Sequence, residues 1–130
     1  MSSAKPPSYE ASHWLVIHGD HIPGKRVRIN YLEAYCRAGS TAADWGQDTV
    51  VRHQTQVISI NEDKTVLRLR DKVSDGLIVE HAIKVCGDEF EFVISTHNPT
   101  DQPSVAHWDQ PCIRLGDFTG FPDRGGDLND

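Results

Sequence analysis

The stretch from Leu77 to Phe118 constrains the fold most, because apolar and polar side chains alternate along it in successive runs. A period of two is typical of a β-strand with one buried face. Residues 77–85 and 90–97 both show this period, and the four residues between them are few enough for a hairpin turn. Gly87 in that turn can take the positive φ that such turns require. We therefore expect two antiparallel strands here, joined directly.

A third strand is expected after the segment 98–103, because its two prolines cannot donate hydrogen bonds to a ladder. The strand pattern resumes at Val105. It is followed by the densest run in the chain of side chains that can catalyse a reaction or bind a ligand: His107, Trp108, Asp109, Gln110, Cys112 and Arg114. Strand alternation puts His107 and Asp109 on one side, and Trp108, Gln110 and Arg114 on the other. Pro111 lies within the run, so we expect this strand to bulge or to lie at a sheet edge.

The rest of the chain predicts further strands separated by turn-forming residues. We expect them at 13–18, 25–36, 49–60 and 65–70, with a loop at 37–48 that includes one helical turn at 42–45. Asp71 and Asp75 are expected in turns. Residues 1–11 are interpreted as a flexible leader and 119–130 as a loose tail, which leaves a single domain at 12–118. About seven strands predict an all-β fold, an antiparallel β-sandwich, with a barrel as the alternative.

Length and charge narrow the classes of partner. The chain has 130 residues, enough for one domain with its own core, and a formal net charge of −6 without a basic block. Nucleic acid and anionic membrane surfaces are bound by clustered cations, so we expect neither partner. No apolar run is long enough to span a bilayer, and the first residues lack the apolar segment of a secretory signal.

The three cysteines, Cys36, Cys86 and Cys112, are an odd number without CxxC spacing. This pattern predicts reduced thiols in a cytoplasmic protein rather than a disulfide framework. We expect each of the three to be a small buried apolar side chain.

The segment DEFEFVI at 88–94, followed by NPTDQP at 98–103 and then by His107-Trp108, resembles the central strand pair of the galactose mutarotase-like superfamily. The resemblance covers roughly residues 65–118. It implies a β-sandwich that recognises sugars. Because this chain is shorter than domains of that superfamily usually are, it implies a partial or reduced form of the fold. Whether the chain is complete or part of a larger protein stays open.

The side of the third strand that carries Trp108, Gln110 and Arg114 suits a carbohydrate or another polyol. The C–H faces of a sugar stack on an aromatic ring, and its hydroxyl groups bind amide and guanidinium donors. Trp45 is either a second ligand platform or a plug packed over the sheet. The alternative for the whole group is structural, with Trp108 in the core and Arg114 paired with a surface acid such as Glu80.

Whether the chain is a sugar-modifying enzyme or an accessory subunit of a carbohydrate-active partner stays open. If it is an enzyme, we expect His107 to act as general acid or base, with Asp109 orienting it if the strand bulges at Pro111. His107 is also the one residue at which the resemblance allows a catalytic role to be carried over. No G-x-S-x-G, P-loop or G-x-G-x-x-G motif is present.

A second hypothesis is a metal-dependent enzyme, because the chain contains seven histidines. His18, Asp20 and His107 would form a two-His-one-carboxylate set for a divalent transition metal such as non-haem iron. Otherwise no cofactor is expected. His81 lies on the same apolar strand face as Val79 and Ile83, so we interpret it as a hydrogen-bonded core histidine, and His53 in the same way.

A third hypothesis is a structural or oligomerisation sandwich without a small-molecule site. Exposed strand edges on short sandwiches pair readily with other chains. A homodimer, or binding to a larger protein, is therefore compatible with all three hypotheses.

Overall fold

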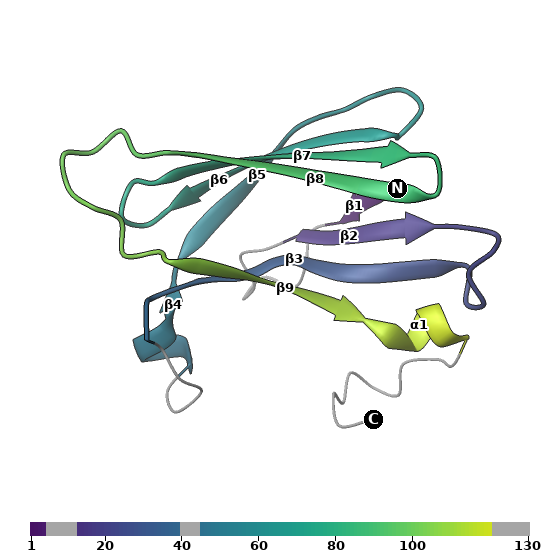
Figure 1. Ribbon diagram of the computed structural model, residues 1–130, viewed down its shortest axis with the longest axis horizontal. Coiled ribbons are helices and arrows are strands. Elements are labelled where there is room, and N and C mark those ends of the chain that lie inside the picture. The colour runs from purple at the N-terminus through teal and green to yellow at the C-terminus, as the bar shows by residue number, and fades with distance from the viewer. Residues whose placement is uncertain (5–12, 40–44, 121–130) are drawn as a thin grey trace.

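The computed structural model describes residues 1–4, 13–39 and 45–120, and these form two antiparallel sheets that lie one above the other (Figure 1). Sheet A contains β1 (Ser2–Ala4), β2 (His13–His18), β3 (Arg26–Cys36), β4 (Val50–Val51) and β9 (Trp108–Arg114). Sheet B contains β5 (His53–Ile60), β6 (Val66–Val73), β7 (Ile78–Cys86) and β8 (Glu89–His97). The predicted all-β antiparallel sandwich is confirmed. The expected hairpin joins β7 to β8, with Gly87 at a φ of 65°.

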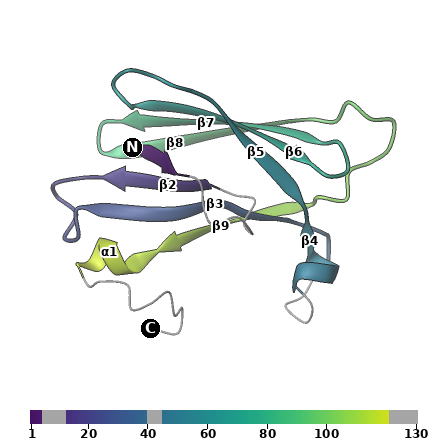
Figure 2. The ribbon, with the colours of Figure 1, turned by 180° about the vertical axis from the view of Figure 1, so that it is seen from behind.

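The strand expected at 49–60 is divided between the two sheets. Its first part, β4, pairs with the end of β3, whereas β5 pairs with β6. Arg52 lies between the two parts, and its carbonyl accepts a hydrogen bond of 2.8 Å from the backbone N–H of Ser74. Seen from behind, β5 descends from one sheet to β4 of the other (Figure 2). Alternation along the sequence cannot reveal such a crossing, because both parts keep a period of two.

Three further expectations at the chain ends and in the loop need correction or lie outside the described residues. Ser2–Ala4 form a strand rather than a leader, because their backbone pairs with β2. The last strand ends at Arg114, which is opposite Arg28, because β3 extends only two residues farther on that side, to Arg26. Helix α1 (Leu115–Thr119) follows. Most of the expected helical turn at 42–45 is not described, but Trp45 begins the π-helical turn η2 (Trp45–Thr49). Residues 5–11 and 121–130 are not described.

The apolar core lies between the inner faces of the sheets. On β6, buried and exposed residues alternate strictly, as a half-buried strand requires. Each fully buried aliphatic side chain contributes roughly 1.5–3 kcal/mol to folding. The core residues of sheet A and of β4 are Leu15, Ile29, Tyr31, Leu32, Tyr35 and Val51, and those of sheet B and its turns are Leu67, Leu69, Val73, Leu77, Val79 and Ile83.

A buried polar network joins the two sheets within this core. The Nε2 atom of His81 lies 2.9 Å from Oδ2 of Asp71, and the Tyr35 hydroxyl donates to the same oxygen. The Tyr35 hydroxyl also lies 3.0 Å from Nε2 of His81, and the Tyr31 hydroxyl lies 2.9 Å from Nδ1. Tyr31 and Tyr35 belong to β3, whereas Asp71 and His81 belong to β6 and β7. The network therefore connects sheet A to sheet B by side-chain hydrogen bonds.

The surroundings of Asp71 keep its carboxyl group ionised. Burial by itself raises the pKa of Asp71, but the hydrogen bond with His81, the hydroxyl of Thr55 and the hydrogen bond from Tyr35 lower it by more. The net pKa lies below the ordinary value. Burial and then the negative charge of Asp71 raise the pKa of Tyr35, so this phenol stays protonated and able to donate.

Asp75 anchors the long connection from β8 to β9. Its carboxylate accepts hydrogen bonds from the Ser104 hydroxyl (2.7 Å), from the Val105 N–H (2.9 Å) and from the Leu77 N–H (3.2 Å). Burial raises its pKa, but these bonds lower it by more, so the pKa lies below the ordinary value. The expected turn position of Asp75 is thus correct, whereas Asp71 lies inside β6 on its buried face.

The first prediction concerns Asp71→Asn. The substitution should lower the free energy of unfolding by about 3 kcal/mol at pH 7, because it removes a buried charge that is hydrogen-bonded to His81 and Tyr35. The folded pKa is below the unfolded one, so the carboxylate stabilises the fold fully above roughly pH 4 and loses this effect as pH falls through the folded pKa. The difference in free energy of unfolding between wild type and Asp71→Asn, measured by urea denaturation, should therefore become smaller below pH ~4.

The matched control is Asp63→Asn, in the exposed turn between β5 and β6. It should change the free energy of unfolding by less than about 0.5 kcal/mol at any pH. A difference between wild type and Asp71→Asn that stays constant from pH 7 to pH 3 would contradict the ionised state of Asp71.

The second prediction concerns Asp75→Ala. Loss of the acceptor for three hydrogen bonds should destabilise the protein by about 1–2 kcal/mol and loosen the β8–β9 connection. Amide hydrogen exchange at Val105 and Leu77 should become faster. Asp101→Ala removes an exposed carboxylate from the same connection and should leave both exchange rates unchanged. Equal exchange rates in the two variants would show that Asp75 does not anchor the connection.

Candidate functional site

The three predicted binding residues of β9 lie on the outer face of sheet A, which points away from sheet B. In the register with β3, Trp108 is opposite Cys36 and Gln110 is opposite Ala34. Asp109, between them, is opposite Tyr35, whose side chain points into the core. Alternation therefore separates Trp108, Gln110 and Arg114 from Asp109, as the sequence predicted. The register shift opposite Pro111 and the edge position of β9 agree with the expected effect of that proline.

Trp108 and Trp45 form an aromatic pair at one end of this face. Their ring centroids are 6.2 Å apart with the planes tilted by 59°. The indole N–H of Trp108 donates to the carbonyl of Arg37 at 3.0 Å, which fixes the orientation of the ring. Trp108 remains 40% exposed, so the alternative that it is a core residue is wrong. Trp45 is half-buried beside it, consistent with packing against Trp108 as well as with contact to a ligand.

Arg114 lies at the other end of β9, over an aromatic ring. Its guanidinium carbon is 5.6 Å from the ring centroid of Trp14, and that of Arg28 is 5.8 Å from the same ring. Both distances are within the range of a cation–π interaction. The alternative pairing of Arg114 with Glu80 is wrong, since Arg114 lies on the outer face of sheet A, whereas Glu80 lies on the outer face of sheet B and pairs with Arg70 at 2.9 Å. This end of the face therefore carries two positive charges beside an indole ring.

Gln110 lies between these two ends and contributes polar groups. Its Nε2 atom donates to a carboxylate oxygen of Glu33 at 3.1 Å. An amide and a carboxylate side by side offer both donors and acceptors, which is what a ligand rich in hydroxyl groups requires. From Trp108 to Arg114 the strand spans roughly 20 Å at about 3.3 Å per residue. We call the group Trp45, Trp108, Gln110, Glu33, Trp14, Arg28 and Arg114 the outer-face site.

The two predicted catalytic residues are not arranged as an acid–base pair. His107 is exposed and precedes β9, and its backbone N–H donates to the carbonyl of Cys36 at 2.8 Å. Asp109 is half-buried opposite Tyr35, and its charge contributes to the raised pKa of both Tyr31 and Tyr35. The structure describes both side chains, and no hydrogen bond joins them. Asp109 therefore does not orient His107, because it faces the core.

The alternative metal ligands lie far apart. His18 ends β2 beside the first residue of β3, and Asp20 follows in the turn. His107 lies beside Cys36, the last residue of β3. Because β3 has eleven residues and is roughly 30 Å long, His107 lies at the opposite end of this strand from His18. One ion cannot bind all three side chains. Within the described part of the chain, no group of three or more His, Cys, Asp or Glu residues is placed to hold a metal ion.

The core histidines agree in part with their interpretation. His81 is 2% exposed and makes hydrogen bonds through both ring nitrogens, as expected. His53 is also buried, with its ring 4.9 Å from that of Tyr35, but its Nε2 atom has no hydrogen-bond partner among the described residues. Burial lowers the pKa of His53, which keeps the ring neutral.

Sequence reasoning missed the partners of His81. Asp71 lies on the same buried face of β6 as Leu67, Leu69 and Val73. A carboxylate on an otherwise apolar strand face was the signal that could have revealed a buried network.

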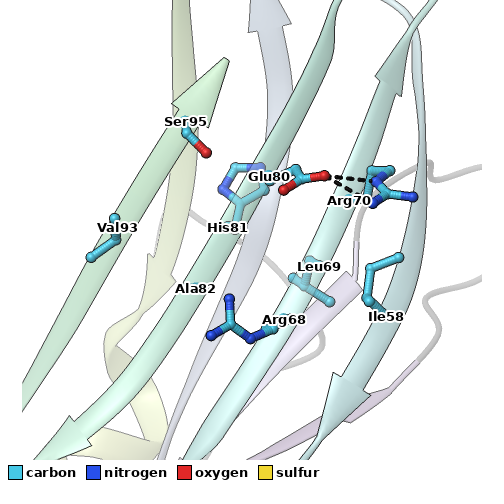
Figure 3. A pocket seen from close by; sticks show the side chains of 9 residues that line it. All are labelled: Ile58, Arg68, Leu69, Arg70, Glu80, His81, Ala82, Val93 and Ser95. Atoms are coloured by element: carbon cyan, nitrogen blue, oxygen red, sulfur yellow. Dashed lines mark hydrogen bonds and ion pairs between the residues drawn. The ribbon is translucent and has the colours of Figure 1, made fainter. Parts of the chain in front are cut away.

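A separate depression of about 160 Å³ lies on the outer face of sheet B (Figure 3). Arg70 reaches across it to Glu80 with two hydrogen bonds to one carboxylate oxygen, at 2.9 and 3.0 Å. Arg68 lies on the same face and has no hydrogen-bond or ion-pair partner among the described residues. None of the predicted site residues takes part. The lining residues are Ile58, Arg68, Leu69, Arg70, Glu80, His81, Ala82, Val93 and Ser95.

The three cysteines are free thiols, but their environments differ. Cys36 is fully buried, Cys112 is half-buried and Cys86 is exposed in the β7–β8 hairpin. Burial raises the pKa of Cys36 and of Cys112, which keeps both thiols protonated. The prediction of a buried cysteine is therefore correct for Cys36 and wrong for Cys86.

No helix within the described residues is long and apolar enough to cross a membrane. Comparisons with protein-family models, with curated proteins and with solved structures found no match to this chain. What the protein binds has to be inferred from its own side chains. The outer-face site is the strongest basis for doing so.

Proposed function

We propose that the protein binds a carbohydrate or a related polyol at the outer-face site. The observation that supports this most is the Trp45–Trp108 pair, in which a 40% exposed indole ring is fixed by a hydrogen bond to Arg37. A fixed, exposed ring is a platform for the C–H face of a sugar, because little side-chain entropy is lost on binding. Gln110 and Glu33 would bind the hydroxyl groups beside it.

The far end of the same site favours a ligand that carries an acidic group. Arg28 and Arg114 place two cations over Trp14, at the end of β9 away from Trp108. An acidic oligosaccharide long enough to cover the roughly 20 Å from Trp108 to Arg114 would stack on Trp108 and direct its carboxylate toward these guanidinium groups.

The wider identity that we propose is a mutarotase-like β-sandwich, on the basis of the residue pattern at 88–108 and its agreement with a two-sheet antiparallel fold. We propose a cytoplasmic location on the basis of the three free thiols. A homodimer, or a larger protein partner, belongs to the same proposal. A sugar-modifying reaction by His107 has less support than binding, because Asp109 faces away from Trp108.

The third prediction tests binding. Isothermal titration with neutral sugars and polyols and with neutral and acidic oligosaccharides should identify a ligand. Trp108→Ala should weaken its binding at least tenfold, because the stacking platform is lost. Phe118→Ala removes an aromatic side chain of similar exposure (44%) on α1 and should leave affinity unchanged. Arg114→Gln should reduce the preference for acids over neutral sugars. Equal affinities for wild type and Trp108→Ala would exclude the site.

The fourth prediction separates binding from catalysis. Once a ligand is known, its anomeric exchange or turnover can be followed by NMR with wild type and with His107→Ala. We expect His107→Ala to bind the ligand as wild type does, because this side chain lies outside the outer-face site. If the wild type shows a reaction that His107→Ala retains at full rate, the proposed acid–base role of His107 is wrong.

A further inference from the structure

Among the described strands, β8 is the one sheet edge that is long, regular and free of both proline and lysine. β1 and β4 are only three and two residues long. β5, the opposite edge of sheet B, contains a bulge between Val57 and Ser59, and β9 contains Pro111. In contrast, β8 pairs nine consecutive residues with β7 without irregularity, and it contains neither proline nor lysine. Bulges, proline, lysine and shortness are the features that keep edges from pairing with other chains.

β8 also exposes apolar side chains on both of its faces. Phe92 and Ile94 point toward sheet A, and the ring of Phe92 lies 5.8 Å from that of Tyr31. Even so, the two side chains are 41% and 45% exposed. Their direct partners on β7, Ile83 and His81, are buried. Val93, on the outer face, is 46% exposed. A neighbouring strand on the free side of β8 would cover all three side chains.

The sequence of β8 is complementary to itself in an antiparallel pair centred on Val93. In that register all nine residues of the strand are paired, with inner-face residues beside inner-face residues. Glu89 and Glu91 lie near the N-terminal end of β8 and His97 lies at its C-terminal end, so no carboxylate is opposite another carboxylate in this pair. The cross-strand pairs are Glu89 with His97, Phe90 with Thr96, Glu91 with Ser95, Phe92 with Ile94, and Val93 with itself.

We propose that β8 pairs with β8 of a second copy of this chain about a two-fold axis at Val93, so that the four strands of sheet B continue into four more. Aromatic and β-branched side chains then stand side by side across the interface, which is the favoured kind of cross-strand contact. The proposal gives the homodimer a defined surface and does not depend on the outer-face site, which lies on the other sheet. Val93 and Ser95 also line the depression on sheet B, so the depressions of the two copies become neighbours.

The first test is the mass in solution of the full chain, by light scattering after size exclusion. The wild type should have twice the mass of one chain, which is 14.5 kDa. Val93→Lys should raise the dissociation constant of the dimer at least a hundredfold, because two ammonium groups would then meet at the two-fold axis. Ile58→Lys changes a residue of similar exposure (41%) on the bulged edge strand and should remain dimeric. A monomeric wild type at 100 μM, roughly the range of weak dimers, would overturn the proposal.

The second test fixes the register and does not depend on how well Val93→Lys folds. In a Cys86→Ser background, Val93→Cys should form a disulfide-linked dimer on mild oxidation, since the two sulfur atoms face each other across the axis. Glu91→Cys should not, because its partner is Ser95. His97→Glu should weaken the dimer, and Glu89→Lys combined with it should restore the dimer. Cross-linking at position 91 rather than 93, or a dimer that ignores all these changes, would contradict this interface.

Discussion

The hydrogen-bonded group of Asp71, His81, Tyr35 and Tyr31 is the interaction on which the arrangement of the two sheets depends. All four residues are buried, so a lost partner would leave a further buried donor or acceptor unsatisfied, in addition to Oδ1 of Asp71, which has no hydrogen-bond partner among the described residues. The partners come from both sheets, and they meet only when β3 stands opposite β6 and β7 in a single relative position. Apolar packing tolerates small shifts between sheets, whereas these hydrogen bonds do not. The network therefore specifies the alignment of a sandwich that apolar contacts hold together.

This alignment also determines which surfaces remain for other tasks. Because Tyr35 points inward, its neighbours on β3 and the residues opposite them on β9 point outward. The outer face of sheet A thereby receives Trp108, Gln110 and Arg114 together. Sheet B contributes a different kind of surface, a regular edge strand with apolar side chains on both faces. The two proposals, ligand binding and self-association, therefore concern different sheets, so variants can test each of them without altering the other surface.

The part of the candidate site that lies on one strand could be predicted from the sequence, and the rest could not. Alternation along β9 was enough to separate Trp108 from Asp109. The same local argument could not place Trp45 beside Trp108, or Trp14 beneath Arg114, because these neighbours come from distant segments. For the same reason His18, Asp20 and His107 looked like a ligand set, although they lie near opposite ends of β3.

The sequence by itself determined most of the strands and their buried faces, the β7–β8 hairpin and the sandwich class, because periodicity and turn residues act over a few neighbouring positions. Only the tertiary structure decided that residues 50–60 cross from one sheet to the other at Arg52, and that Asp71 is a buried partner of His81 rather than a turn residue. Both depend on pairing between segments far apart in the chain. The energy of a buried charge or of a sheet crossing is set by the groups that surround it in space, and local sequence does not contain them.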